Sequence, residues 1–179
     1  QEQAVIREFG NVIPAADHRF RMERMLYSDR IASAERVAGL AGGRELTKAF
    51  AAVTRNENNA GSLLNAVPQA QRRAAFLFAQ SRHLRRAGKY KEAAAVMLKA
   101  PKDATSLVDP DAWWVERRVL SRELLDLGDA ATAYKLAAAH AAESPSHAVD
   151  AEFHAGWYAF RGLGDARAGA RHFARIAEI

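Results

Sequence analysis

Three side chains in the stretch HAVDAEFH, residues 147–154, have a spacing that could bind a metal ion. His147, Asp150 and His154 stand at positions i, i+3 and i+7, so a helix would place them on one face. Imidazole and carboxylate groups are zinc ligands, but a structural zinc site needs about four of them. The sequence marks no fourth ligand, and His147 begins the expected helix. We therefore predict no metal site and no cofactor.

Glycoside cleavage is a second chemistry that acidic residues could perform. It generally needs two carboxyl groups about 5–10 Å apart. Glu116 and Glu123 are seven residues apart on one helical face, and Arg117 follows Glu116. This arrangement is typical of a solvated or salt-bridged helix surface, which is the interpretation that we favour. The sequence also lacks phosphate-binding glycine motifs and a serine nucleophile elbow. We predict no catalytic residue in this chain.

Basic residues cluster in three places, at residues 18–24, 72–73 and 82–86. In the last cluster, Arg82, Arg85 and Arg86 follow the i, i+3, i+4 rule and would share one side of a helix. They could attract an anionic partner or form an ordinary solvated surface, and both interpretations stay open. Binding of nucleic acid would need a basic groove with stacking aromatic rings. The aromatic residues nearby, Phe76 and Phe78, are better explained as core, so we predict no nucleic-acid partner.

The composition limits the class of protein only loosely. The chain of 179 residues has a formal charge of +5 and a pI of about 9.8, a modest bias towards anionic partners that ordinary domains share. It has no cysteine, which excludes disulfides and thiolate chemistry but leaves the compartment open. No stretch approaches 18 consecutive apolar residues, so we predict no membrane span.

Regularly spaced glycines predict how the helices are organised. Alanine is abundant, Val, Ile and Thr are sparse, and no alternating apolar pattern occurs, which indicates an all-α fold. Gly88, Gly128 and Gly164 are 40 and 36 residues apart, and each can close one helix in the left-handed conformation. Asp129 and Asp165 follow two of them and can cap the next helix. This repetition is typical of an α-α superhelix, a solenoid of helix pairs similar to tetratricopeptide repeats. We expect about five such pairs.

The same marks place the elements. We expect helices at residues 16–27, 29–40, 44–54, 63–67, 69–87, 90–100, 110–127, 130–142, 147–163 and 165–178. Residues 101–110 form the one long connection. The first residues look like the end of a helix and the last like the middle of one, so we expect a single domain, 1–179, that is a fragment of a longer chain. Ile176 and Ile179 would lie at an exposed apolar edge of the last repeat.

The adjacent Trp113 and Trp114 begin a helix in the stretch DPDAWWVERR, residues 109–118. Asp109 can cap this helix and Pro110 suits its first turn. Neighbouring side chains on a helix point about 100° apart, so the two rings should contact two different neighbours. We favour a core position for Trp113. For Trp114 both a core position and a platform for a sugar ring stay open. Trp114 is therefore a candidate glycan or partner contact, together with the arginines at positions 82, 85 and 86.

Several segments resemble one known family. They are VDPDAWWVERRVLSRELLDLGDAATAYKLAAAHA, then AEFHAGWYAF and GDARAGARHFARI, and near the N-terminus AADHRFRMERMLYSDRIASAERVAGLAG. They are similar to the superhelical, U-type domain of soluble lytic murein transglycosylases in its alphaproteobacterial form. The resemblance implies a right-handed α-superhelix. It also implies a periplasmic enzyme that cleaves the glycan strands of peptidoglycan and leaves 1,6-anhydromuramoyl ends.

In that family a separate, lysozyme-like C-terminal domain performs the reaction. Its catalytic Glu is usually followed by Ser, with a Gly-Leu-Met-Gln stretch shortly after. The one Glu-Ser pair here is Glu143-Ser144, which Pro145 follows at once, and Gly-Leu-Met-Gln is absent. We therefore expect a scaffold without catalytic power, whose parent protein is the transglycosylase. The expected partners are its own catalytic domain, peptidoglycan glycan strands and other proteins. The alternative is a helical-repeat module that binds a peptide or protein and has no link to an enzyme.

Overall fold

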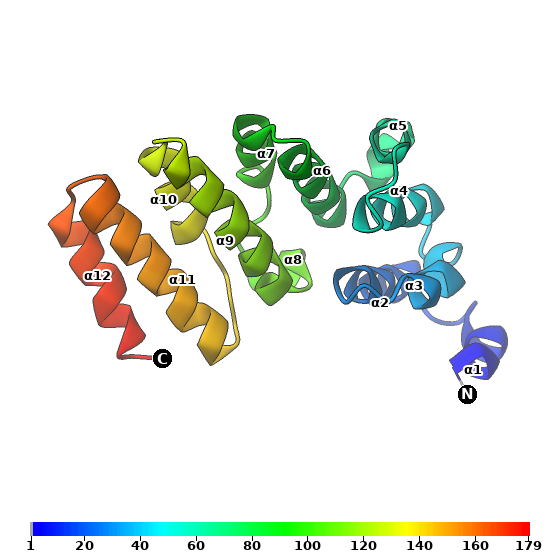
Figure 1. Cartoon of the computed structure of the whole chain (residues 1–179). Coiled ribbons are helices and arrows are strands. Elements are labelled where there is room, and N and C mark those ends of the chain that lie inside the picture. The colour runs from blue at the N-terminus through cyan, green and yellow to red at the C-terminus, as the bar shows by residue number, and fades with distance from the viewer. Residues whose placement is uncertain (1) are drawn as a thin grey trace. The chain divides into compact units, whose positions relative to one another are not determined.

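The structure, a computed structural model, describes residues 2–179 (Figure 1). In that range the regular elements are helices joined by turns and loops, and there is no β-strand. This confirms the predicted all-α fold of packed helices. The chain divides into two compact units, one that ends at His83 and one that comprises Leu84–Ile179. None of the helices in the described range combines the length and the apolar character that crossing a bilayer requires.

The first unit contains five short helices and most of a sixth. They are α1 (Glu2–Phe9), α2 (Ala15–Tyr27), α3 (Ile31–Ala38), α4 (Arg44–Thr54), α5 (Ala60–Ala66), the 3-10 turn η1 (Gln69–Gln71) and α6 (Ala74–Arg86). Helix α2 packs on α3 and α4, and α4 packs on α5. Three buried rings form the centre of this core. Phe50 and Phe78 stack with their centroids 5.9 Å apart, and Tyr27 meets both edge-on, a geometry that adds to the stabilisation from apolar burial.

The second unit contains the helices with the predicted repeat. They are α7 (Tyr90–Met97), α8 (Ala104–Leu107), α9 (Pro110–Asp126), α10 (Ala130–Ala138), α11 (Pro145–Trp157), the π-helical segment η2 (Tyr158–Gly162) and α12 (Ala166–Ile176). Helix α9 packs on α7, α10 and α11, and α11 packs on α12, as Figure 1 shows. Ala133, Ala137, Ala151 and Ala155 are fully buried. Because these side chains are small, the helices can approach closely on two sides.

The predicted caps are confirmed. Gly88, Gly128 and Gly164 have φ angles of 73°, 81° and 68°, which is the left-handed conformation that favours glycine. The Asp129 and Asp165 carboxylates accept hydrogen bonds from backbone N–H groups three residues ahead. Each cap satisfies a donor that the first turn of a helix leaves without an intrahelical partner. The turns of the repeat are therefore fixed by local hydrogen bonds.

Several predicted boundaries are wrong. The expected connection at residues 101–110 contains the short helix α8, because Asp103 accepts a hydrogen bond from the Ser106 N–H and caps it. The helix expected at 69–87 begins as a 3-10 turn and becomes α-helical only at Ala74. The helix expected at 147–163 begins earlier, with Pro145 in its first turn, and changes to a π-helix at Tyr158.

Candidate functional site

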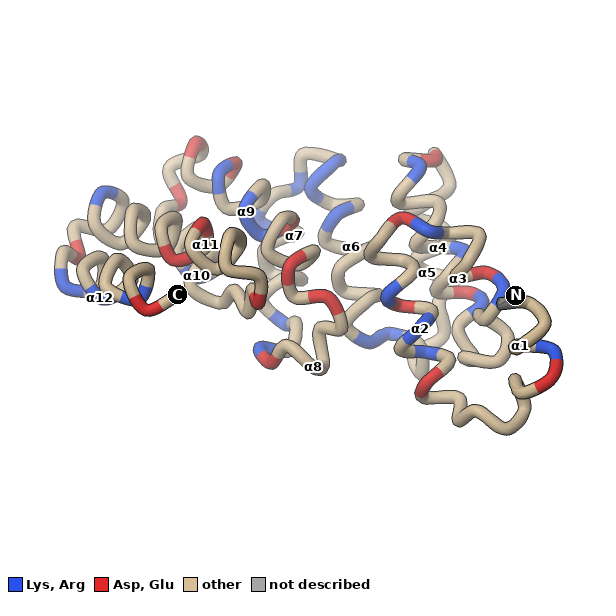
Figure 2. The backbone as a smooth tube through the Cα atoms, turned by 90° about the horizontal axis from the view of Figure 1, so that it is seen from below, with Lys and Arg blue, Asp and Glu red and all other residues tan. Residues whose placement is uncertain are grey.

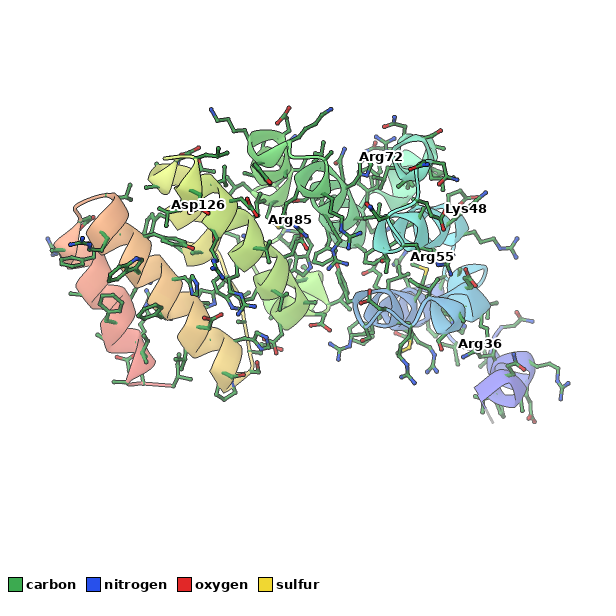
Figure 3. All side chains as sticks on the ribbon, viewed as in Figure 1. Arg36, Lys48, Arg55, Arg72, Arg85 and Asp126 are labelled. Atoms are coloured by element: carbon green, nitrogen blue, oxygen red, sulfur yellow. The ribbon has the colours of Figure 1, made fainter. Side chains whose placement is uncertain are left out.

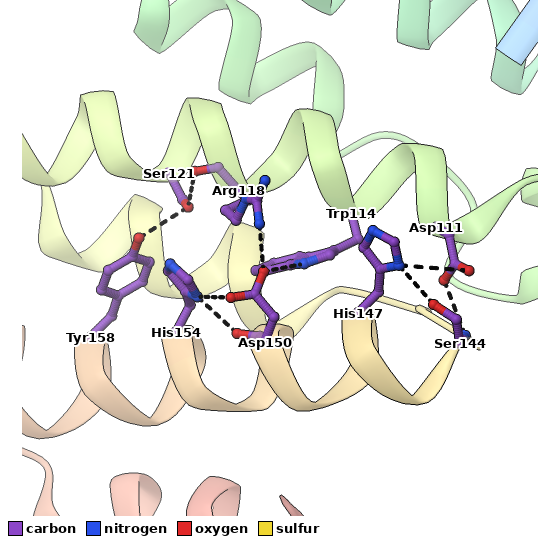
Figure 4. Close-up of polar contacts among 9 residues, drawn as sticks. All are labelled: Asp111, Trp114, Arg118, Ser121, Ser144, His147, Asp150, His154 and Tyr158. Atoms are coloured by element: carbon purple, nitrogen blue, oxygen red, sulfur yellow. Dashed lines mark hydrogen bonds and ion pairs between the residues drawn. The ribbon is translucent and has the colours of Figure 1, made fainter. Parts of the chain in front are cut away.

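The face of α11 that carries His147, Asp150 and His154 is turned towards α9 (Figure 4). His147 Nδ1 lies 2.7 Å from Ser144 Oγ and 3.9 Å from an oxygen of Asp111. By contrast, His154 Nδ1 lies 3.2 Å from Asp150 Oδ1. The three side chains therefore take part in two separate sets of contacts. Over the described part of the chain, no group of three or more His, Asp or Glu residues could hold a metal ion.

Asp150 joins α11 to α9 through one carboxylate oxygen, Oδ2 (Figure 4). The indole N–H of Trp114 and the Nη1 of Arg118 both donate to this oxygen over 2.9 Å. Burial of the carboxyl opposes its ionisation, but these hydrogen bonds outweigh burial and hold the pKa of Asp150 below its ordinary value. An ionised carboxylate shared by two donors stabilises the packing of two helices, and it is poorly suited to proton transfer.

Trp114 lies in the core, so its ring offers no surface to a sugar. None of its surface is exposed, and His140 and His154 meet the ring edge-on with centroids 6.2 Å and 5.6 Å away. The sequence left open whether Trp114 is a core residue or a platform for a sugar ring, and the structure places it in the core. Trp113 is also buried, and α9 has neighbours on more than one side, as the adjacent tryptophans predicted.

The three arginines proposed as a contact surface lie on α6 and differ in their surroundings. Arg85, which Figure 3 labels, forms an ion pair with Glu116 of α9, with Nε 2.5 Å from Oε1 and Nη2 3.3 Å from Oε2. Only 3% of the Glu116 side chain is exposed, so this pair is part of the packing. The Arg82 guanidinium lies over the Phe78 ring, 4.5 Å from its centroid. Arg86 is exposed, so the three arginines do not form one uniform basic surface.

The Glu-Ser pair has no catalytic setting. Glu143 is exposed and lies in the turn before α11. The backbone N–H groups of Glu143 and Ser144 donate to Asp111 Oδ1 over 2.9 Å and 3.2 Å, which ties this turn to the start of α9. Glu116, the other acid considered above, is paired with Arg85 rather than with its sequence neighbour Arg117.

A buried acid–base cluster that the sequence did not reveal lies around Glu152 of α11. His172 Nδ1 is 2.6 Å from one oxygen of Glu152, and His140 Nε2 is 3.2 Å from the other. Arg175 also reaches this carboxylate, and the Tyr134 hydroxyl lies 3.2 Å from His172 Nε2. Burial of Glu152 opposes its ionisation, but the hydrogen bonds from His172 and His140 outweigh it and lower its pKa. The residues come from the helices α10, α11 and α12 and from the connection after α10, which holds His140, so no local spacing could have indicated the cluster.

One hollow in each unit has a volume of about 400 Å³. The one in the first unit measures about 410 Å³ and has both acidic and basic residues in its lining. Lys48 and Arg55 belong to it (Figure 3), and Arg55 lies 3.7 Å from Glu57. The buried Thr47 hydroxyl in its wall has no hydrogen-bond partner among the described residues. Because its charges have both signs, this hollow favours no particular class of charged ligand.

The hollow of the second unit measures about 400 Å³ and has basic residues but no Asp or Glu among the described residues that line it. Its lining comprises Leu98, Ala100, Lys102, Arg117, Tyr134, Lys135, Ala138 and Ala139. Lys and Arg are spread along many helices of the chain (Figure 2), so a basic composition alone did not single out these positions. In the sequence, Arg117 stands out only as the neighbour of Glu116.

An exposed aromatic surface lies at the last helix pair, on α11, η2 and α12. Phe153, Trp157, Phe160 and Phe173 are between 36% and 49% exposed. The rings of Phe153 and Trp157 stack with centroids 6.4 Å apart. Of the two isoleucines expected at an exposed apolar edge, Ile179 is exposed and Ile176 is only partly exposed. Clustered exposed apolar side chains mark surfaces that bind proteins or ligands.

Comparison with known proteins identified no relative, since no protein-family model, curated protein or solved structure matches this chain.

Proposed function

We propose that this chain is a non-catalytic helical scaffold of a periplasmic lytic transglycosylase. It would position a separate lysozyme-like domain and help to hold peptidoglycan glycan strands. The proposal rests on the sequence resemblance described above, together with the capped helix pairs of the second unit. It is also supported by the internal ion pairs and hydrogen bonds of the acidic residues Glu116, Asp150 and Glu152 in that unit.

The observation that carries the non-catalytic part is that three acids of the second unit are bound internally. Glu116 is paired with Arg85, Asp150 is shared by Trp114 and Arg118, and Glu152 accepts hydrogen bonds from two histidines. A general acid for glycoside cleavage needs a raised pKa and access to the sugar bond. The pKa shifts of Asp150 and Glu152 are in the opposite direction.

The test is to incubate the chain with purified peptidoglycan and to analyse the soluble products by mass spectrometry. We expect no anhydromuropeptides from this chain. Their release at a rate above that of the buffer would contradict the non-catalytic assignment.

Glycan binding is tested separately by co-sedimentation with insoluble peptidoglycan. We expect the double variant Arg82→Gln/Arg86→Gln on α6 to sediment less than the unaltered chain. The matched control is Arg167→Gln/Arg171→Gln, which removes the same charge from α12 and should sediment normally. Arg85 is kept in both, because its ion pair with Glu116 is part of the packing. Equal losses in both variants would indicate a general effect of net charge instead of a contact surface on α6.

The alternative function is a helical-repeat module that binds a protein, and the exposed aromatic surface of α11 and α12 favours it. Aromatic residues are enriched in protein interfaces and dominate their binding energy. The variant Phe153→Ser/Trp157→Ser separates the two proposals. It should leave sedimentation with peptidoglycan unchanged if the chain is a glycan scaffold, whereas a protein-binding module would lose its partner.

A further inference from the structure

Arg117 of α9 is a buried cation without a counter-charge. Only 2% of its surface is exposed, and its Nη1 forms no hydrogen bond with any described residue. Its guanidinium lies near the Trp113 ring, 5.7 Å from the centroid, which is a weaker partner than a carboxylate. Burying a charge is costly unless it is paired and hydrogen-bonded. A buried donor with no partner therefore needs an explanation.

The acid next to Arg117 in the sequence does not provide that partner. Glu116 forms its ion pair with Arg85, and no described carboxylate contributes to the pKa shift of Arg117. Burial alone lowers the pKa of Arg117, to about 10, so the guanidinium is still charged at neutral pH. The compensating negative charge would then have to come from outside the chain.

The hollow that Arg117 lines could admit such a charge. It lies over α9, between the connection from α7 to α8 and the end of α10. Lys102 and Lys135 also line it, and both are exposed to solvent, so they would stand at its rim. The pKa of the cap residue Asp129 is lowered mainly by its hydrogen bond from the Thr132 N–H, and nearby Lys135 adds a small contribution in the same direction. Two cations at the rim and one in the depth produce a positive potential, which low-dielectric walls strengthen.

The remaining lining is apolar or aromatic. Leu98, Ala100, Ala138 and Ala139 contribute hydrocarbon surface, and Tyr134 contributes its ring. A volume of about 400 Å³ lies in the range of small-molecule sites, which combine apolar walls with a few polar groups that fix orientation. A bare inorganic ion would fill only part of this space, so the lining suits an anionic group attached to a larger body.

We propose that this hollow is a binding site for a small oxyanionic ligand, with Arg117 as the deep anchor and Lys102 and Lys135 at the rim. The planar guanidinium matches the oxygen atoms of a carboxylate or a phosphate in a forked geometry. The ligand carries that group on an apolar or aromatic body, which packs on Leu98 and the alanines. This site is independent of the proposed scaffold function.

Isothermal titration calorimetry of the full chain tests the site with three probes. They are inorganic phosphate, phenyl phosphate and benzoate. We expect phenyl phosphate or benzoate to bind more tightly than inorganic phosphate because of the apolar lining. The stronger of these two probes identifies the anionic group as phosphate or carboxylate.

Variants then locate the site. Arg117→Met should weaken binding of the stronger probe at least about tenfold, which corresponds to about 1.4 kcal/mol. Lys102→Gln/Lys135→Gln should weaken it by a smaller factor, since exposed charges contribute less. The control Arg122→Met removes an exposed arginine from the same helix and should change nothing. The proposal would be overturned if Arg117→Met bound the probe as tightly as the unaltered chain. It would also be overturned if none of the three probes bound at concentrations up to about 10 mM.

The variant Arg117→Lys controls for the possibility that Arg117→Met loses binding because it is misfolded. It keeps the charge but loses the forked donor geometry, so it should bind more weakly than the unaltered chain and more tightly than Arg117→Met. Circular dichroism confirms that each variant is folded before titration. If Arg117→Lys binds no better than a folded Arg117→Met, the deep positive charge is not the anchor and the proposal fails.

Discussion

Replacing Arg117 by methionine should stabilise the chain in the absence of any anion. The guanidinium is buried without a counter-charge, and burial lowers its pKa from the ordinary arginine value to about 10. Since one pKa unit corresponds to about 1.4 kcal/mol, burial of this charge costs roughly 3 kcal/mol. Methionine is unbranched and fills irregular core space, so the variant keeps most of the apolar contacts and removes the charge.

Part of this gain is offset by the loss of the contact with Trp113. The guanidinium lies 5.7 Å from the centroid of that ring, and a cation–π contact away from water contributes up to about 2 kcal/mol. The expected net effect is therefore an increase in the free energy of unfolding of about 1–2 kcal/mol at neutral pH. Stabilisation by removal of a buried charge is well within the range found for charges replaced by apolar side chains.

Urea denaturation followed by tryptophan fluorescence is the appropriate assay. All three tryptophans lie in residues 84–179, so the signal reports on the unit that contains Arg117. The unfolding midpoint should rise with an unchanged slope, and the control Arg122→Met should stay within about 0.5 kcal/mol of the unaltered chain. A fall of about 1 kcal/mol or more for Arg117→Met would contradict this expectation, because it would mean that the guanidinium has a stabilising partner within the fold.

Three further predictions concern helix packing and turns. Asp150→Asn should lower the free energy of unfolding by about 1–3 kcal/mol at pH 7, because the buried Trp114 N–H loses a charged acceptor. The depressed pKa of Asp150 means that its stabilisation is present above the ordinary pKa near 4 and is lost as the pH falls through the lower folded value. The deficit should therefore shrink in urea titrations at about pH 3, and an equal deficit at both pH values would contradict this. Gly128→Ala should cost about 1–2 kcal/mol in the same assay, since φ is 81° there, whereas Gly128→Asn should cost less; equal costs would exclude backbone strain. Gly156→Ala should cost about 1–3 kcal/mol, because its new methyl group would lie 2.6 Å from the Phe173 ring. Adding Phe173→Leu should recover part of that loss, and no recovery would exclude this clash as the cause.

Much of the local structure could be predicted because it depends on groups close together in the sequence. The capping hydrogen bond of Asp129 spans three residues, and the left-handed turn at Gly128 depends on that residue itself. Helix α4 begins at Arg44 and ends at Thr54 as predicted, and Gly42 just before it also has a left-handed φ, of 63°. Where short-range signals were weak the prediction failed, as at α8, whose four residues have one capping carboxylate and no apolar repeat.

The candidate site could be predicted only in part, since its contacts join distant residues. A projection of α9 indicated that Trp113 and Trp114 have different neighbours, but it could not show that Asp150, 36 residues away, satisfies the Trp114 indole. Arg85 was expected as a surface residue, and Glu116, 31 residues away, holds it in the packing instead.

The order of amino acids specifies an all-α chain of capped helix pairs, because helix propensity and capping act over a few residues. Which charges are paired follows from the packing of the helices. Arg85, Arg117 and Arg118 have the same charge and lie in similar helical stretches. Arg85 is paired with the buried Glu116, and Arg117 is buried with no carboxylate as partner. Arg118 donates to Asp150, the same carboxylate that accepts from Trp114. They differ because a side chain's electrostatic environment depends on the helices packed around it, and these come from distant parts of the chain.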